Sequence, residues 1–217
     1  MSSAGDGLVI KERLGSDVDA VVYRLFPFVR SLRIHPDTLT LTGALVSLAA
    51  AWALAEEQRF GAGLLLMVAG FFDLVDGVVA RQQGLSSSAG AFFDSSIDRL
   101  SDLVIFGGIA VARASAGDTG GTVLVMWAIT ATVMTSYTRA SAEKRLHTLK
   151  VGVMERGERF GVLIVGALSG FLLTAVFAIA VGATITALQR VREGRRLLRE
   201  LDATGVDPTR EEVASGG

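Results

Sequence analysis

Long apolar stretches separated by short polar or basic segments make up most of this 217-residue chain. A helix that spans the hydrocarbon core of a bilayer needs about 20 mostly apolar residues. Six stretches approach that length, although the fifth is short and is followed by a Ser169-Gly170 turn. The pattern predicts an all-α integral membrane protein with six transmembrane helices. Their approximate residues are 38–55, 60–80, 91–112, 122–136 with a helical extension toward Arg145, 159–168 and 171–188.

The basic residues lie mainly on one side of the predicted membrane. The loops after the first, third and fifth helices carry only Arg59 and Arg113. The other side carries the basic residues before the first helix, between the fourth and fifth, and after the sixth. By the positive-inside rule, both termini are predicted to be cytoplasmic and the number of spans to be even.

The predicted membrane domain covers residues 17–202, and its six spans lie within residues 38–200. The two ends of the chain differ from it in composition. Residues 17–33 interleave apolar residues with arginines, which is typical of an amphipathic helix lying on the membrane surface. A soluble helix packed on the bundle is the alternative. Residues 1–16 and 203–217 are polar and are predicted to be flexible tails.

Four aspartates interrupt the apolar pattern of the second and third predicted helices. Because carboxylates at membrane depth are costly, such a cluster indicates a functional site. Asp73 and Asp76 are spaced i, i+3, and Asp94 and Asp98 are spaced i, i+4, so each pair shares one helix face. Oxygen ligands without His or Cys favour Mg²⁺ or Mn²⁺. Two such ions would balance four carboxylates, an arrangement common in phosphoryl chemistry, and a diphosphate is the natural substrate.

Other charged residues change this picture little. Arg81 and Arg99 flank the aspartates and could offset phosphate charge; alternatively, the aspartates merely pair with these arginines. Asp102, one turn further on, is predicted to be an ion-pairing group rather than a metal ligand. The net charge of −1 does not favour nucleic-acid binding, and the absence of cysteine excludes thiolate metal sites.

The pattern D-x2-D-G-x2-A-R-x8-G-x3-D-x3-D resembles the signature of the CDP-alcohol phosphotransferases. The resemblance implies an enzyme that moves a substituted phosphate from a CDP-linked lipid to an alcohol and releases CMP. It also implies six spanning helices with an N-terminal interfacial helix, and a homodimer. Every fixed position of the pattern is present, namely Asp73, Asp76, Gly77, Ala80, Arg81, Gly90, Asp94 and Asp98.

The resemblance also implies roles for individual residues. Asp73, Asp76 and Asp94 would hold two Mg²⁺ or Mn²⁺ ions. Asp98 would lie near the metals and accept the proton of the acceptor hydroxyl, which a carboxylate within hydrogen-bond reach can do. A second family element, at residues 36–40, opens the first helix, although a plain helix cap also favours Pro and Asp there. The implied CDP-lipid contacts are Asp37, Thr38, Leu39, Thr40, Gly77, Ala80, Arg81, Ser87 and Gly90.

Three arginines indicate the acceptor. Arg139, Arg156 and Arg159 suit phosphate through forked hydrogen bonds, so they predict a phosphorylated alcohol; the alternative is that they anchor the protein to lipid headgroups. The E-R-x-E-R run at 155–159, with Asp37, resembles the prokaryotic branch that makes phosphatidylinositol phosphate from inositol phosphate. Ser141 departs from that branch, which usually has a basic residue there. Glycerol 3-phosphate is the next candidate, then inositol or another alcohol, and the lipid tails stay open.

Two other classes of protein share parts of this pattern. Intramembrane prenyltransferases also use Asp-rich motifs and diphosphates, but they have more spans and two separated motifs. An ion transporter would fit acidic residues in the membrane, yet these aspartates map toward the cytoplasmic third of their helices. The sequence therefore predicts a phospholipid-synthesis enzyme of the cytoplasmic membrane, with its active site open to the cytoplasm.

Overall fold

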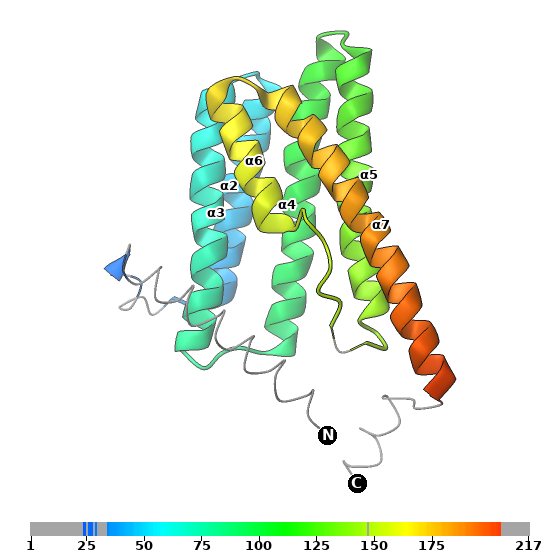
Figure 1. Cartoon of the computed structure of the whole chain (residues 1–217). Helices are drawn as coiled ribbons and strands as arrows, with labels where there is room; N and C mark the ends of the chain where they lie inside the picture. The colour runs from blue at the N-terminus through cyan, green and yellow to red at the C-terminus, as the bar shows by residue number, and fades with distance from the viewer. Residues whose placement is uncertain (1–23, 25, 28, 30–33, 147, 205–217) are drawn as a thin grey trace. The chain divides into compact units, whose positions relative to one another are not determined.

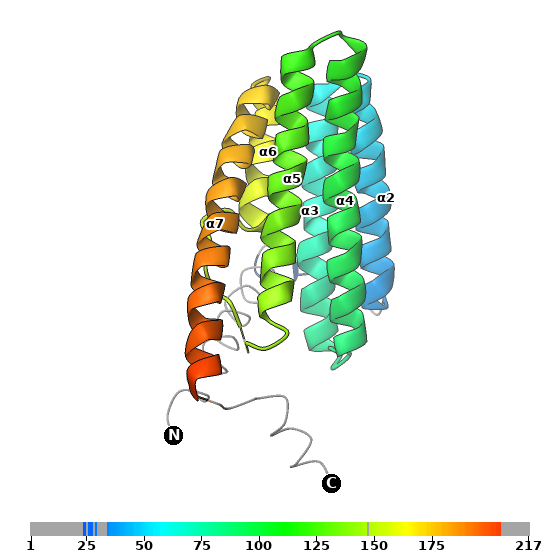
Figure 2. The same cartoon turned by 90° about the vertical axis from the view of Figure 1, so that its right-hand side faces the viewer.

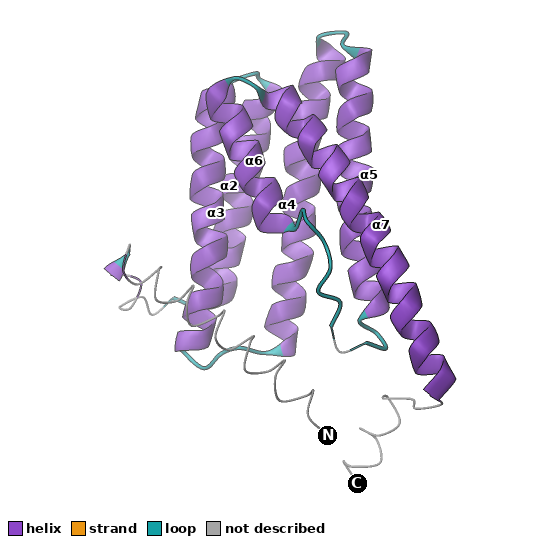
Figure 3. Ribbon diagram, viewed as in Figure 1, coloured by secondary structure: helices purple, strands orange, loops and turns teal. Residues whose placement is uncertain are grey.

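The computed structural model describes residues 24, 26, 27, 29, 34–146 and 148–204. Among these residues the regular secondary structure is helical throughout and no strand occurs (Figure 3). Each of the six predicted helices is present, so the all-α prediction is confirmed. The six helices are α2 (Pro36–Ala55), α3 (Arg59–Gln82), α4 (Ser88–Ser115), α5 (Thr119–Ala142), α6 (Arg156–Ser169) and α7 (Leu172–Thr204) (Figure 1).

The helix ends differ from the ends of the apolar runs for local reasons. Helix α4 begins at Ser88 because the Ser87 hydroxyl accepts a hydrogen bond from the backbone N–H of Gly90 at 3.0 Å, which caps the helix. Helix α7 continues past Leu188 to Thr204, because arginine, glutamate and leucine are good helix formers even outside an apolar run. Helix α5 ends at Ala142, short of the predicted extension toward Arg145.

Four helices in the described part of the chain, α2, α3, α5 and α7, are long and apolar enough to cross a membrane. This supports a multi-pass membrane protein. Helix α6 has 14 residues and is therefore about 21 Å long, which is shorter than the ~30 Å hydrocarbon core. Helix α4 has 28 residues but carries aspartates and arginines along its length. The count of six spans is therefore not established by length and composition.

The predicted interfacial helix at 17–33 falls largely outside the described residues. So do the two predicted tails, apart from the last helical residues of α7. The domain boundaries predicted at these ends stay predictions.

The chain divides into two compact units. The first consists of the described parts of Met1–Ala49 and Leu65–Ser101, so it holds the start of α2, the end of α3 and the start of α4. Its core contains five buried aliphatic residues with three phenylalanines packed against them. These residues are Val29, Leu39, Val75, Val78 and Val79, with Phe26, Phe71 and Phe72.

The second unit consists of the described parts of Ala50–Leu64 and Asp102–Gly217. Within it, α7 packs against both α5 and α6 (Figures 1 and 2). The indole N–H of Trp127 on α5 donates to the Thr184 hydroxyl on α7 at 3.0 Å. Helix α6 ends at Gly170, whose φ of 83° is left-handed and favours glycine. The predicted turn between the last two helices is thus confirmed.

Candidate metal and phosphate site

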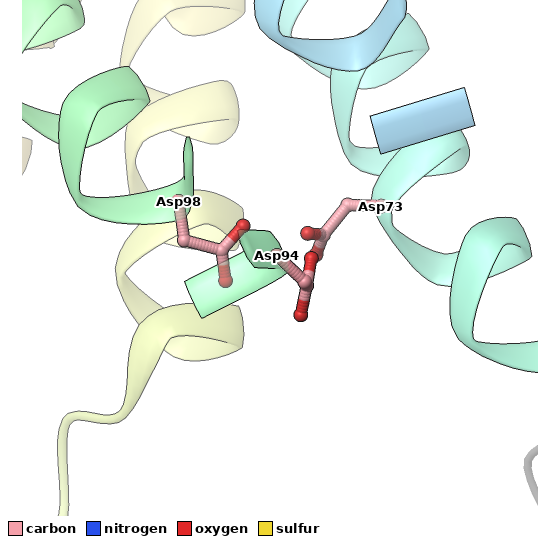
Figure 4. Close-up of side chains that lie close together, drawn as sticks. All are labelled: Asp73, Asp94 and Asp98. Atoms are coloured by element: carbon pink, nitrogen blue, oxygen red, sulfur yellow. The ribbon is translucent and has the colours of Figure 1, made fainter. Parts of the chain in front are cut away.

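Three of the four predicted metal ligands lie together in the first unit. Asp73 comes from α3, while Asp94 and Asp98 come from adjacent turns of α4, and their side chains point toward one another (Figure 4). One carboxylate oxygen from each lies within 4.8 Å of the others. Asp73 is exposed and the other two are half-buried, so the cluster is accessible from outside the helices.

This arrangement fits a hard divalent cation. An octahedral Mg²⁺ holds its oxygen ligands at about 2.1 Å, so two ligands on opposite sides of the ion are about 4.2 Å apart. The oxygens of the cluster lie within 4.8 Å of one another, which is close to that spacing. Because the three donors are all carboxylates, they match the chemistry of Mg²⁺ or Mn²⁺ rather than that of a softer metal.

Asp76 is held differently from the other three aspartates. It is 6% exposed, and its Oδ2 accepts a hydrogen bond of 2.7 Å from the Thr40 hydroxyl of α2. This bond joins the start of α2 to the end of α3. Asp76 does not belong to the three-carboxylate group, so its role as a metal ligand stays a prediction.

A cavity of about 780 Å³ opens beside the aspartates, between the start of α2, the end of α3 and the start of α4. Both Asp76 and Asp94 line it. Most of the predicted CDP-lipid contacts line it too, although they come from three separate parts of the sequence. These residues are Asp37, Thr40, Gly77, Ala80, Arg81, Ser87 and Gly90.

Two predicted contacts do not line this cavity. Leu39 is 5% exposed and packs in the hydrophobic core of the first unit. Thr38 is exposed, and the structure does not bring it to the cavity. Conversely, His35 and Phe93 line the cavity and were missed. In the sequence, only their positions indicated them: His35 directly precedes the Pro36-Asp37 start of α2, and Phe93 directly precedes the motif residue Asp94.

The cavity is suited to an anion for two reasons. Helices α2 and α4 both begin at it, and the first turn of a helix carries unsatisfied backbone N–H groups and a partial positive charge. Arg81, in the last turn of α3, adds a full positive charge to its wall. Because Asp37, Asp76 and Asp94 line the same cavity, a diphosphate would be stabilised here together with divalent metal that neutralises these carboxylates.

The predicted acceptor arginines lie in the second unit, and two of them share one carboxylate. The side chain of Arg159 is only 6% exposed, and its Nη2 lies 2.9 Å from Asp102 Oδ2. Arg156 Nε lies 3.8 Å from Asp102 Oδ1, and its guanidinium stacks over the Phe160 ring. Asp102 is therefore an ion-pairing residue, as predicted.

Arg139 of α5 pairs with two glutamates rather than with Asp102. Its Nε donates to Glu143 Oε1 at 3.0 Å, and its Nη1 lies 3.9 Å from Glu155 Oε1. Its side chain is 40% exposed, the most accessible of the three. Arg139 is thus the guanidinium that a soluble phosphate reaches most easily, while Arg159 is more buried and also pairs with Asp102.

A fourth arginine, which was not predicted as a site residue, anchors the segment that leads into α6. Arg190 on α7 is 5% exposed and donates three hydrogen bonds. They run to the carbonyl oxygens of Val151 at 2.7 Å and Thr135 at 2.9 Å, and to Glu155 Oε1 at 2.9 Å. The sequence showed only a basic residue at the end of an apolar run, because its partners are distant in the chain.

Thr186, one turn before Arg190, holds the same segment. Its hydroxyl accepts from the backbone N–H groups of Val153 at 3.2 Å and Met154 at 3.0 Å. Gly152 has a φ of 144°, which L-residues with a side chain rarely adopt, and a Cβ there would overlap the Thr186 side chain. Helix α7 therefore fixes the chain just before α6, and with it the start of the helix that carries Arg156 and Arg159.

The aspartate cluster and the adjoining cavity fit a metal-dependent site for a phosphate-bearing ligand. Residues 33–189 match the family described as CDP-alcohol phosphatidyltransferase, and the chain belongs to this family. It is 37% identical over 181 residues to an archaetidylinositol phosphate synthase of Pyrococcus horikoshii, covering 81% of this chain and 91% of that protein.

Two solved structures share the fold. One is phosphatidylinositol phosphate synthase of Mycobacterium tuberculosis with CDP-DAG bound, with a TM-score of 0.69, 24% identity, and 84% of this chain and 94% of that chain covered. The other is the same enzyme in complex with manganese and citrate, with a TM-score of 0.70 at 24% identity, covering 83% of this chain and 88% of that one. At this identity the likeness concerns the fold alone.

Proposed function

We propose that this enzyme transfers a phosphatidyl group from CDP-diacylglycerol, or from an ether-linked analogue, to a hydroxyl of inositol phosphate. The products are phosphatidylinositol phosphate and CMP. The observation that carries the proposal is the convergence of Asp73, Asp94 and Asp98 beside a cavity that Asp94 itself lines. Membership of the family and the printed activities of its relatives support the choice of substrates.

The reaction forms one bond and breaks another at the lipid-bearing phosphorus. The acceptor hydroxyl oxygen attacks that phosphorus, the bridging oxygen leaves with CMP, and the hydroxyl proton passes to Asp98. A positioned carboxylate commonly contributes about 10²- to 10⁴-fold in such a proton transfer. The cavity residues, with Arg81 and the starts of α2 and α4, bind the diphosphate and keep the phosphorus in place.

The proposed metal ligands are Asp73, Asp76, Asp94 and Asp98. They would hold two Mg²⁺ or Mn²⁺ ions, because two divalent ions balance the charge of four carboxylates. Bound metal would neutralise charge on the diphosphate and on the leaving CMP. Arg139, Arg156 and Arg159 are proposed to bind the phosphate of the acceptor, since guanidinium groups bind phosphate by paired hydrogen bonds.

The first test is an acceptor screen with purified protein, CDP-diacylglycerol and Mg²⁺ or Mn²⁺. Inositol phosphate is expected to give CMP release at least about tenfold faster than inositol or serine. An acceptor without a phosphate leaves the phosphate-binding arginines without their partner. Chelation with EDTA should lower the rate by roughly a thousandfold, and added Mn²⁺ should restore it. The absence of CMP with every acceptor would contradict the transferase proposal.

Glycerol 3-phosphate is the second candidate acceptor, and Ser141 favours it. That residue is exposed on α5 and removes a basic group usual in the inositol-phosphate branch. If glycerol 3-phosphate gives the higher kcat/KM in the same screen, the product is phosphatidylglycerophosphate and the acceptor assignment changes while the reaction class stands.

The proposed topology has six spans, a surface helix at 17–33 and both termini in the cytoplasm. Basic residues of the loops support it through the positive-inside rule. Because the chain has no cysteine, single cysteines at Glu57 and Lys150 can be labelled with an impermeant maleimide in intact cells. Labelling at position 57 but not at 150 is expected, and the reverse pattern would invert the topology. A homodimer is also proposed, on the basis of the family resemblance.

A further inference from the structure

Helix α7 continues well beyond the membrane-spanning part of its sequence. Its 33 residues make it about 50 Å long, against a hydrocarbon core of about 30 Å. Its apolar part ends near Gln189, so the last turns lie in or beyond the headgroup layer of the membrane. These turns carry five arginines, namely Arg190, Arg192, Arg195, Arg196 and Arg199.

A groove of about 360 Å³ lies between these turns of α7 and the end of α5. The two helices run side by side, and α7 continues past the end of α5 (Figures 1 and 2). Tyr137 and Ser141, one turn apart on α5, line one wall, and Arg195 and Arg199, one turn apart on α7, line the other. Their i, i+4 spacing directs both guanidinium groups to the same side of the helix.

Three arginines line the groove, and one of them, Arg190, is paired with Glu155. The other two, Arg195 and Arg199, differ in their partners from the neighbouring Arg196. Arg196 lies 2.6 Å from Glu193 Oε1 and 3.7 Å from Glu200 Oε1. Within the described residues, neither Arg195 nor Arg199 forms an ion pair. The one carboxylate of the groove wall, Asp202, is paired with Arg145 at 3.0 Å. The groove therefore has a positive charge that no carboxylate among the described residues neutralises.

This groove is separate from the proposed acceptor arginines. On α5, Arg139 is directed toward Glu143 and Glu155 and does not line the groove, whereas Tyr137 and Ser141 do. On the membrane side, the groove continues into apolar surface. Val191 lines the groove at 49% exposure, and Leu188, one turn earlier, is 64% exposed.

We propose that the groove between α5 and α7 binds an anionic membrane phospholipid. Arg195 and Arg199 bind its phosphate by charge-assisted hydrogen bonds, and Tyr137 lies at the interface level that tyrosine favours. An acyl chain follows Val191 and Leu188 toward the hydrocarbon core. The apolar continuation is why a lipid, rather than a free phosphate, fits the groove.

The test is lipid titration of the full-length protein, measured by native mass spectrometry in detergent. The Arg195→Gln/Arg199→Gln variant is expected to bind phosphatidylglycerol at least roughly tenfold more weakly than the unmodified protein, since each of the two basic groups near an anionic lipid contributes about fivefold. The matched control, Arg192→Gln/Arg196→Gln, removes the same charge from the same turns outside the groove and should bind normally. Phosphatidylcholine binding should be low and equal in all three proteins.

Three results would overturn the proposal. Equal loss in both double variants would indicate a general effect of positive charge, and no loss in either would remove the arginines from lipid binding. Competition of millimolar inorganic phosphate with phosphatidylglycerol would identify a site for soluble phosphate. Since the readout is lipid binding and not CMP release, its failure is distinguishable from failure of the proposed transferase function.

Discussion

Asp98→Asn is expected to lower kcat by about 10³- to 10⁴-fold, at the upper end of the contribution of a general base. The asparagine keeps the size of the side chain but cannot accept the proton of the acceptor hydroxyl. Because Asp73 and Asp94 remain, and the diphosphate cavity is lined by other residues, metal-dependent binding of CDP-diacylglycerol should persist. CMP release gives the rate, and equilibrium binding of the CDP-lipid with and without Mn²⁺ gives the second readout.

Two comparison variants make this experiment decisive. Glu56→Gln removes a carboxylate from the exposed connection between α2 and α3 and should leave both readouts unchanged. Asp73→Asn alters the exposed member of the cluster and should weaken Mn²⁺ binding as well as turnover. Substantial turnover by Asp98→Asn would remove this residue from the base role. Loss of CDP-lipid binding in the same variant would instead make Asp98 chiefly a metal ligand.

The sequence predicted the aspartate cluster well because its geometry is mostly helical. Spacing alone places Asp94 and Asp98 on one face of α4. The short connection between α3 and α4 makes these helices antiparallel neighbours, so Asp73 comes within reach. The spacing did not show that Asp76 bonds to Thr40, because that partner is on another helix and 36 residues away.

The cavity shows the limit of motif-based prediction. A motif identifies a segment of the chain, but the helical periodicity determines which side chains of that segment face the cavity. Asp37 and Thr40 line the cavity, whereas Leu39 between them is turned into the core. The contacts of Arg190 were likewise invisible in the sequence, since Val151, Thr135 and Glu155 reach it only through tertiary packing.

Arg159→Met is expected to have two separable effects. It leaves the buried Asp102 with only the more distant Arg156, and breaking a buried ion pair from one side costs about 3–5 kcal/mol. It also removes a proposed phosphate ligand, which should raise KM for inositol phosphate by about tenfold to a hundredfold. KM for CDP-diacylglycerol should change little. Thermal unfolding and steady-state kinetics measure the two effects independently.

The double variant Asp102→Asn/Arg159→Met decides whether Arg159 binds the acceptor or only holds the fold. Without the charge of Asp102, the loss of Arg159 no longer leaves this buried carboxylate without its closest cation, so most of the lost stability should return. The raised KM for inositol phosphate should not return, because the guanidinium is still missing. If stability and KM recover together, Arg159 acts only through its pair with Asp102, and the acceptor phosphate is bound by Arg139 and Arg156.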